Sequence, residues 1–248
     1  MRLASSLAPF ILVAAAVGCS SAPRGAPSTA PTPAIGASYP TELRWVRTSA
    51  EYRALMLQTF RAAGRQLVIA SRGLATGSWA VILDADETVL DNSEYQKRLG
   101  AAHARYSDSS WALWVRESAA PAVPGAVEFT RRVHALGGLV AIVTNRAEPL
   151  CEVTRKNLTE VGIPADLVLC QTPGVSDKNP RFRLIESGSA RPGIPPLKVL
   201  AWVGDNIQDF PMLTQGARND PARLAEFGVR YFALPNPMYG SWEKNPDQ

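Results

Sequence analysis

A short apolar run that stops abruptly in carboxylates constrains this chain more than any other stretch. Residues 79–92 read WAVILDADETVLDN, and the run 80–83 has the length and β-branched content of a strand buried on both faces. Asp84 and Asp86 follow it directly, and ligands of open α/β sheets bind outside the carboxyl ends of the strands. Because neighbouring carboxylates repel each other, a cation or a shared proton is expected between them. A divalent metal is the simplest answer.

The same residues also have an ordinary structural interpretation, in which Asp84 and Asp86 are turn residues and Thr88 caps a helix. The DxDxT pattern by itself does not separate the two interpretations. The chemical one is favoured by three further polar clusters, each just after or near a strand-like run: TNR at 144–146, Lys178 in a polar loop, and GDNIQD at 204–209.

Length and composition allow one substantial core. The 248 residues are 46% hydrophobic, which suits one large domain or two small ones. The formal net charge of +4 is mild and the basic residues are scattered, so we expect no nucleic acid polymer among the partners.

The first residues have the pattern of an export signal. Arg2 precedes an apolar run at 8–17, which is shorter than the roughly 20 residues that span a bilayer. The small residues before Cys19 resemble a bacterial lipobox, with Ala16 in place of the usual leucine. We expect a lipoprotein signal peptide at 1–18 and a lipidated Cys19; an ordinary cleaved signal is the alternative, and both export the protein.

A tether is expected to follow, with the folded domain after it. Residues 19–40 are rich in Pro, Ser and Ala without periodic apolar positions, so they cannot bury a core. From residue 41 to 248, helical and strand-like segments alternate, which predicts βαβ units, a mainly parallel sheet and all polar clusters at one edge. Helices are expected at 49–70, with Ser49 as N-cap, at 124–138, 149–161 and 182–187, and a short one around 111–115. Strands are expected at 80–83, 139–143, 167–169, 199–203 and 230–234.

The four clusters, in this order and strand context, resemble the four motifs of the haloacid dehalogenase (HAD) superfamily. Its fold is a Rossmann-like three-layer α/β sandwich, and the aromatic-rich segment at about 93–122 would be a small helical cap insert. The segments LDNSEY, WALWV, AVPGAVEF, VGDNIQDF and LPNPMYGSWE are similar to the class C bacterial acid phosphatases, outer-membrane lipoproteins with 5′-nucleotidase activity. This resemblance covers roughly residues 43–243. It implies a lipid-anchored protein of the outer membrane, on its periplasmic or surface side.

Phosphoryl transfer depends on positioning and charge stabilisation. The resemblance implies that Asp84 is the nucleophile that forms an aspartyl-phosphate, and that one Mg²⁺ per subunit is held by the carboxylates of Asp84 and Asp205 and the backbone carbonyl of Asp86. Asp86 would protonate the leaving group and then deprotonate water, which favours mildly acidic conditions. Asp86 also argues for phosphate chemistry, since dehalogenases of the superfamily lack this second aspartate.

The remaining polar residues are expected around the transferring phosphoryl group. Thr144 offers a hydroxyl, Asn145 its amide and Lys178 a positive charge. Asp209 would orient Lys178 or a metal-bound water, although a helix N-cap is its ordinary interpretation. Two nearby arginines can share the role of the lysine: Arg181 and Arg183.

Aromatic residues can bind the leaving group. Tyr239, Trp111 and Trp114 are candidates to stack on a nucleobase, with the two tryptophans also suited to the core of the cap. Two cysteines other than Cys19 are left, Cys151 and Cys170, and they are expected at one edge of the sheet, either as a disulfide or as two free buried thiols.

The sequence therefore predicts an exported phosphatase that acts on a small phosphomonoester, with a nucleoside 5′-monophosphate as the expected substrate. Two alternatives stay open: a phosphatase for other small esters, and a non-catalytic surface-binding lipoprotein with the same fold. The second alternative gives no reason for a proton donor at Asp86. A homodimer is compatible with the sequence.

Overall fold

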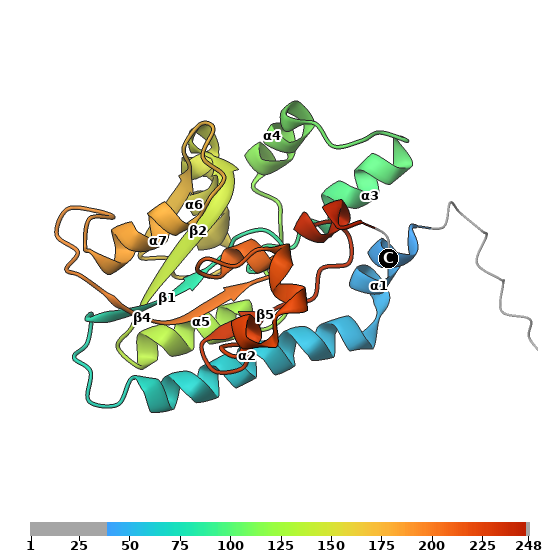
Figure 1. Ribbon diagram of the computed structural model, residues 1–248. Helices are drawn as coiled ribbons and strands as arrows, with labels where there is room; N and C mark the ends of the chain where they lie inside the picture. Colours follow the sequence, from blue (N-terminus) through green and yellow to red (C-terminus); the bar gives the residue numbers. More distant parts are fainter. Residues whose placement is uncertain (1–38, 247–248) are drawn as a thin grey trace, which may run out of the picture. The chain divides into compact units, whose positions relative to one another are not determined.

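The computed structural model describes residues 39–246, in which a five-stranded sheet carries helices on both faces (Figure 1). All strand pairings are parallel, in the order β3-β2-β1-β4-β5. The expected α/β sandwich with a mainly parallel sheet is confirmed. The strands are β1 (Trp79–Leu83), β2 (Leu139–Ala147), β3 (Leu167–Gln171), β4 (Lys198–Gly204) and β5 (Tyr231–Ala233).

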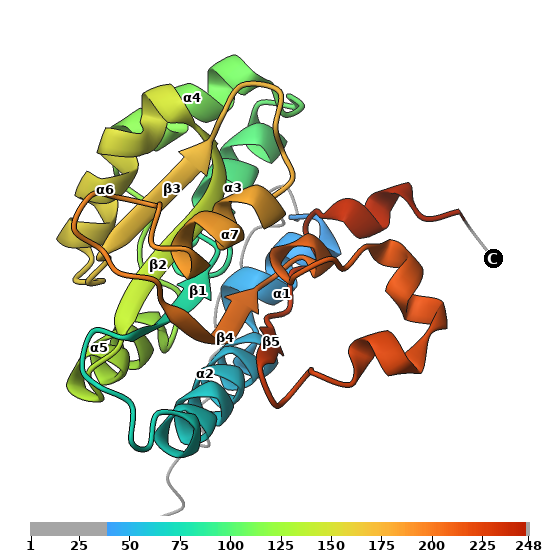
Figure 2. The same ribbon diagram turned by 60° about the vertical axis from the view of Figure 1, so that its left-hand side comes forward.

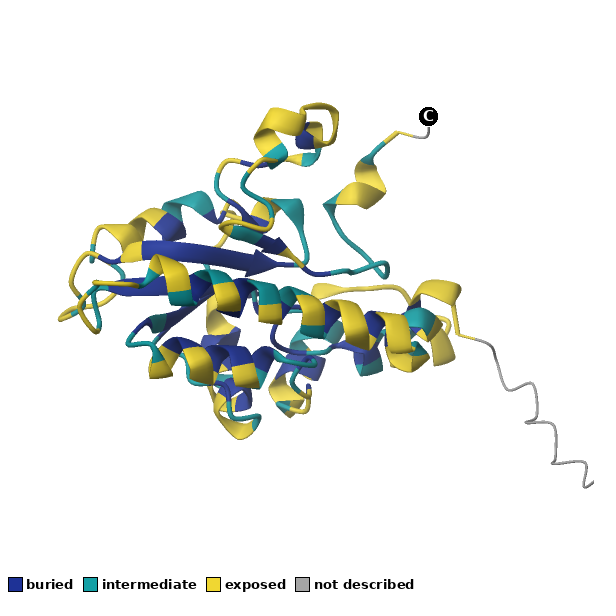
Figure 3. Cartoon of the chain, turned by 90° about the horizontal axis from the view of Figure 1, so that it is seen from below, coloured by how far each residue is buried: buried dark blue, intermediate teal, exposed yellow. Residues whose placement is uncertain are grey.

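The sheet is buried because its strands are apolar on both faces. Residues of β1 alternate between two clusters: Val81 and Leu83 pack on one face, Ala80 and Ile82 on the other. The first face is covered by α2 (Ala50–Ala70), α5 (Ala126–Ala135) and α6 (Cys151–Glu160). The second is covered by α7 (Asn179–Glu186) and the 3₁₀ segments between β4 and β5. Figure 3 shows the buried sheet between helices whose outer sides are exposed.

Two helices were not expected from the sequence. α1 (Thr41–Thr48) buries only Leu43 and Val46, and eight residues are too few for a clear helical period. α3 (Ser93–Ala101) precedes α4 (Asp108–Glu117), so the insert at 93–122 contains two helices rather than one. The predicted cap of α2 is confirmed, because the Ser49 side chain accepts a hydrogen bond from the Tyr52 amide at 3.0 Å.

One strand and one helix are longer than the sequence predicted, because each includes polar residues that were expected in a loop. β2 runs on to Ala147, so the segment 144–146 lies in the strand instead of after it, with a register shift against β3 between Val143 and Ala147. α7 begins at Asn179, earlier than expected, because Pro180 is compatible with the first turn of a helix. Lys178 is therefore the residue directly before a helix.

Strand order brings the carboxyl ends of three strands together. β1 pairs with both β2 and β4, with Leu83 opposite Ile142 on one side and Val203 on the other. The chain crosses over β1 between β3 and β4, so the switch in strand order lies beside β1, as Figure 2 shows. Such a switch point is where open α/β sheets bind ligands.

The two sulfur atoms of Cys151 and Cys170 are bonded, with 5.8 Å between the Cα atoms. Of the two alternatives open from the sequence, the structure contains the disulfide. It joins the start of α6 to β3, next to the edge of the sheet. Within residues 39–246, no helix combines the length and the apolar character that crossing a membrane requires. Residues 1–18 and Cys19, like most of the segment 19–40, lie outside the described residues.

We expect the disulfide to contribute substantially to stability. It closes a loop with a sequence separation of 19 residues, and loops of that size correspond to about 3 kcal/mol of unfolding free energy. Urea unfolding of the Cys151→Ala/Cys170→Ala variant should show a loss of this size, and reduction of the wild-type protein should reproduce most of it. Equal stability of the oxidised and reduced wild-type protein would contradict the prediction.

Candidate active site

Most of the residues singled out in the sequence line one cavity of about 750 Å³ at the carboxyl ends of the strands. Its floor is polar and comes from the segments directly after β1 and β4, from the end of β2 and from the residue before α7. Its wall comes from the insert and from the segment after β5. The predicted site residues that line it are Asp84, Asp86, Asn145, Lys178, Asp205, Asp209, Trp111 and Tyr239.

Lys178 lies at the centre of the polar floor. Its Nζ is 2.5 Å from Asp84 Oδ1 and 2.6 Å from Asp209 Oδ1, and only 5% of its side chain is exposed. Asp209 Oδ2 accepts a hydrogen bond from the Asn206 amide at 2.8 Å, so both oxygens of this carboxylate are engaged within the protein. The structure thus places Asp209 where it fixes the ammonium group beside Asp84.

Arg181 supports the end of β2 and does not replace the lysine. Its Nη1 donates to the Thr144 carbonyl at 2.5 Å and its Nη2 to Asn145 Oδ1 at 2.6 Å. With Oδ1 of Asn145 taken by the arginine, the Nδ2 donors are the part of this amide that can serve an anion. The other arginine considered, Arg183, is exposed on α7.

Thr144 differs from the expectation that its hydroxyl faces the substrate. The residue is fully buried and does not line the cavity, and its Oγ1 accepts a hydrogen bond from the Arg146 amide at 3.1 Å. In this structure it shapes the end of β2. The reason is that β2 continues to Ala147, so Thr144 is a buried residue within the strand and not the first residue of a loop.

Asp86 is bound by Arg146, for which the sequence predicted no role beyond membership of the TNR cluster. Arg146 is 1% exposed, and its Nη2 and Nε lie 2.8 Å and 2.9 Å from Asp86 Oδ1. The same oxygen accepts a hydrogen bond from Asn92 Nδ2 at 2.9 Å. An arginine at the end of a buried strand was the available signal, because buried arginines require an acceptor.

Carboxylates also crowd the floor around Asp84. Oxygens of Asp84, Asp205 and Asp209 all lie within 4.8 Å of one another. Burial raises the pKa of Asp84 to about 7 against the opposing charge of Lys178, and burial likewise raises the pKa of Asp205 well above its usual value. Such a set of hard oxygen donors fits Mg²⁺, which offsets their repulsion. Asp84 and Asp205 would supply carboxylate oxygens, and the Asp86 carbonyl is the third expected ligand.

Two residues orient Asp205 from outside this cluster. Thr88 Oγ1 donates to Asp205 Oδ1 at 3.1 Å, and Asn236 Nδ2 donates to Oδ2 at 2.8 Å. Thr88 is therefore part of the acidic site's support rather than a helix cap. Asn236 comes from the segment after β5, LPNPMYGSWE, which carried part of the family resemblance although no role was predicted for Asn236 itself. Hydrogen bonds of this kind fix the direction in which a carboxylate meets a metal.

The aromatic wall contains two of the three predicted stacking residues. Tyr239 and Trp111 line the cavity together with Tyr95 and Tyr106. Trp114 does not: it is 3% exposed, and its Nε1 donates to Asn92 Oδ1 at 2.8 Å. The expectation for Trp114 is corrected, because a buried indole needs a partner for its N–H and this one faces the interior of the insert.

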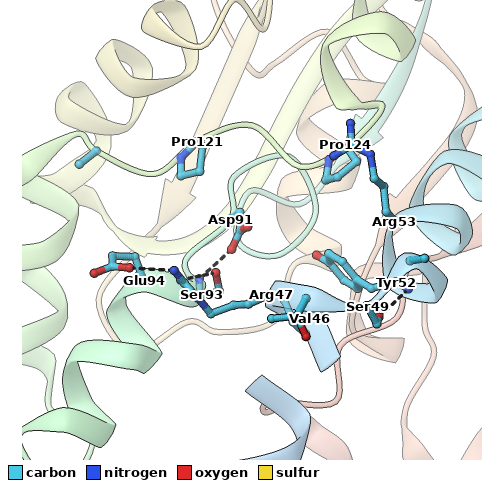
Figure 4. Close-up of a pocket in the computed structure, with 13 residues that line it drawn as sticks. Val46, Arg47, Ser49, Tyr52, Arg53, Asp91, Ser93, Glu94, Pro121 and Pro124 are labelled. Carbon is cyan, nitrogen blue, oxygen red and sulfur yellow. Dashed lines mark hydrogen bonds and ion pairs between the residues drawn. The ribbon is translucent and has the colours of Figure 1, made fainter. Parts of the chain in front are cut away.

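A second cavity of about 680 Å³ has a different character. It lies between the start of α2 and the segment that carries Pro121 and Pro124 (Figure 4). Its Arg47 is already bound to Ser93 at 3.1 Å and to Glu94 at 3.2 Å. It lacks the carboxylates and lysine that converge in the first cavity, so we assign the chemistry to the first.

Comparison with known proteins agrees with this geometry. The model of the HAD superfamily, subfamily IIIB (acid phosphatase), matches residues 12–242. The structure of the class C acid phosphatase from Bacillus anthracis is 30% identical with a TM-score of 0.73, covering 82% of this chain and 85% of that one. A tungstate-bound structure of that enzyme is 28% identical, with a TM-score of 0.72 and the same coverage.

Similarity to curated proteins is weaker. The stem 28 kDa glycoprotein of Glycine max is 27% identical over 167 residues, which are 64% of this chain and 58% of the soybean protein. The chain therefore spans less than two thirds of that relative's length. The family model, by contrast, covers nearly all of the residues that build the cavity. The chain belongs to subfamily IIIB of the HAD superfamily, the acid phosphatase subfamily.

Proposed function

We propose that this protein is a metal-dependent phosphomonoesterase that hydrolyses nucleoside 5′-monophosphates through an aspartyl-phosphate. The observation that carries the proposal is the position of Asp84. It stands at the carboxyl end of the central strand, 2.5 Å from the Lys178 ammonium and beside Asp205, on the floor of an open cavity. A carboxylate beside a fixed cation, with a further carboxylate close by that can share a metal ion, is suited to attack an anionic phosphoryl group.

In each step of the proposed reaction, a residue of the cavity transfers the proton or stabilises the charge. An Asp84 oxygen attacks phosphorus, the new acyl-phosphate bond forms, and the ester P–O bond breaks. Asp86 gives its proton to the departing oxygen, then takes one from the water that cleaves the acyl-phosphate. Lys178 and the Asn145 amide contact the phosphoryl oxygens during transfer. Bound Mg²⁺ would neutralise charge between the carboxylates and the phosphate.

The aromatic wall supports a nucleotide as substrate. Trp111 and Tyr239 lie in the same cavity as the acidic floor, so a base can stack there while the phosphate meets Asp84. Tungstate bound to the Bacillus anthracis relative is a tetrahedral oxyanion like phosphate. A phosphatase for other small esters is the alternative within this chemistry. A purely binding lipoprotein is disfavoured, because binding alone needs no proton donor such as Asp86 beside the nucleophile.

Export and anchoring belong to the same proposal. The pattern before Cys19 supports a lipidated, tethered protein of the bacterial envelope, on the periplasmic or surface side of the outer membrane. The Cys151–Cys170 disulfide supports an oxidising compartment. A homodimer is compatible with this arrangement.

The nucleophile can be tested directly. Asp84→Asn should reduce phosphate release from a nucleoside 5′-monophosphate by about 10⁴-fold or more, the scale of removing a nucleophile. Phosphate release from a panel that also contains glycerol phosphate and phosphotyrosine would rank the substrates. Chelation of metal should abolish the wild-type activity and Mg²⁺ should restore it. Full turnover by Asp84→Asn, with the fold intact by circular dichroism, would refute the proposed mechanism.

Metal binding should depend on pH. Because burial raises the pKa of Asp84 from 3.8 to about 7, the metal-free protein should become less stable as pH rises from about 4 through 7. Mg²⁺ requires the ionised carboxylates, so at saturating concentration its stabilisation should grow over the same range, to roughly 5 °C in melting temperature at pH 8. Asp205→Asn should lose this shift. A shift of equal size at pH 5 and pH 8 would contradict the assignment.

The stacking role of Tyr239 has a matched control. Tyr239→Ala should lower kcat/KM for a nucleotide by about 5- to 150-fold, the equivalent of about 1 to 3 kcal/mol of base stacking. Tyr239→Phe keeps the ring and should retain activity. Neither change should affect hydrolysis of glycerol phosphate, which has no base. Loss on both substrates would indicate that Tyr239 supports the cavity instead of binding a base.

A further inference from the structure

The carboxyl group of Asp86 is held at only one of its two oxygens. Three hydrogens converge on Oδ1, from Arg146 Nη2 at 2.8 Å, Arg146 Nε at 2.9 Å and Asn92 Nδ2 at 2.9 Å. Within residues 39–246 no donor to Oδ2 is found, and Asp86 lines the cavity. An oxygen of a carboxylate has two lone pairs, and these three donors already occupy both on Oδ1, so any proton on this carboxyl group is carried by Oδ2.

We propose that Arg146 is a positioning residue that presents the acidic proton of Asp86 to the leaving group. The inference rests on the proposed phosphatase function. In the first step, the Asp84 oxygen–phosphorus bond forms and the ester bond breaks, while the proton on Asp86 Oδ2 moves to the departing oxygen. Arg146 keeps Oδ1 as the acceptor of its own hydrogen bonds, so the carboxyl group cannot turn its proton away from the cavity.

The surroundings of Arg146 hold its guanidinium in one orientation. Its Nη1 donates to Thr154 Oγ1 at 3.3 Å on α6, and its Cζ lies 5.6 Å from the centre of the Trp111 ring. A planar guanidinium group with partners on several sides holds a carboxylate in one orientation, whereas the ammonium group of a lysine acts as a point charge and does not. Because Arg146 is 1% exposed and does not line the cavity, it reaches the substrate only through Asp86.

Asn92 completes the arrangement and its amide orientation is determined by its neighbours. The residue is fully buried, and its Oδ1 accepts the hydrogen bond from Trp114 Nε1 at 2.8 Å. An indole N–H is only a donor, so Oδ1 must face Trp114 and Nδ2 must face Asp86. The third donor on Asp86 Oδ1 is thus set by the core of the insert.

The test uses the dependence of the rate on the leaving group. An alkoxide needs a proton to depart, whereas the 2,4-dinitrophenolate ion does not. Arg146→Lys should lower kcat/KM by about 10²-fold for the alkyl ester that the wild-type protein hydrolyses best, because general acid catalysis contributes about 10²- to 10⁴-fold. Hydrolysis of 2,4-dinitrophenyl phosphate should change by less than about threefold. The ratio kcat/KM reports substrate binding and the transfer of the phosphoryl group to Asp84 but not the later hydrolysis, since the transfer is the first irreversible step.

A double-mutant cycle tests whether Arg146 acts through Asp86. In an Asp86→Asn background, Arg146→Lys should cause no further loss on the alkyl ester beyond about twofold. Arg98→Lys is the matched control: Arg98 also binds a carboxylate, Glu117 at 2.8 Å, and lies 5.0 Å from the Trp114 ring, but has no contact with Asp86. Arg98→Lys should keep the wild-type ratio between kcat/KM for the alkyl ester and kcat/KM for 2,4-dinitrophenyl phosphate.

The outcomes separate the inference from the function on which it rests. If the wild-type protein hydrolyses neither ester, the proposed phosphatase function is wrong. If the wild-type protein is active but Arg146→Lys lowers kcat/KM equally for both esters, Arg146 is not a positioning residue. The same conclusion follows if Arg146→Lys still lowers kcat/KM for the alkyl ester in the Asp86→Asn background. Should Arg146→Lys fail to fold in a thermal melt, Asn92→Ala removes one donor and should give a loss of about 10-fold on the alkyl ester alone.

Discussion

The crowding of carboxylates at the end of a buried parallel sheet is the constraint on which the site depends. Asp84, Asp205 and Asp209 converge there because β1 and β4 are neighbours in register, with Leu83 opposite Val203. Burial disfavours the charged forms of Asp84 and Asp205, and the buried ammonium of Lys178 binds both Asp84 and Asp209. A buried lysine with this many partners stays charged. The floor of the cavity is thus a fixed arrangement of charge, which phosphoryl transfer requires.

The strands and the polar residues that end them could be predicted from the sequence. An unbroken apolar run of β-branched residues followed by aspartates has few other interpretations in a chain that alternates strands and helices. Parallel strands end at a common edge, so Asp84 and Asp205 could be assigned to one site without coordinates, whereas Lys178, in a loop before a helix, was assigned to it through the resemblance to the superfamily motifs. The predicted ends of the strands were less accurate. The polar residues from Thr144 onward were taken to follow β2, although the strand continues to Ala147.

The residues that hold the site together could not be predicted. Arg181, Asn236 and Arg146 act across distances of 36, 31 and 60 residues in the sequence, and each contacts an atom on another element. A local pattern describes a residue's own strand or helix, whereas these contacts depend on side-chain direction in the folded chain. Trp114 shows the same limit, since helical spacing placed it near Trp111 but did not reveal its hydrogen bond to Asn92.

The insert and the catalytic floor are therefore parts of one packed structure. Trp114 fixes Asn92, Asn92 and Arg146 bind Asp86, and Trp111 lies against Arg146 while lining the cavity. A rearrangement of the insert would move the Trp111 ring in the cavity wall and the donors that hold Asp86 at the same time. Because a polar network is strong only when all its members are satisfied, loss of one contact weakens the others. In the proposed mechanism, the leaving group and the proton that it receives would therefore be positioned by the same few side chains.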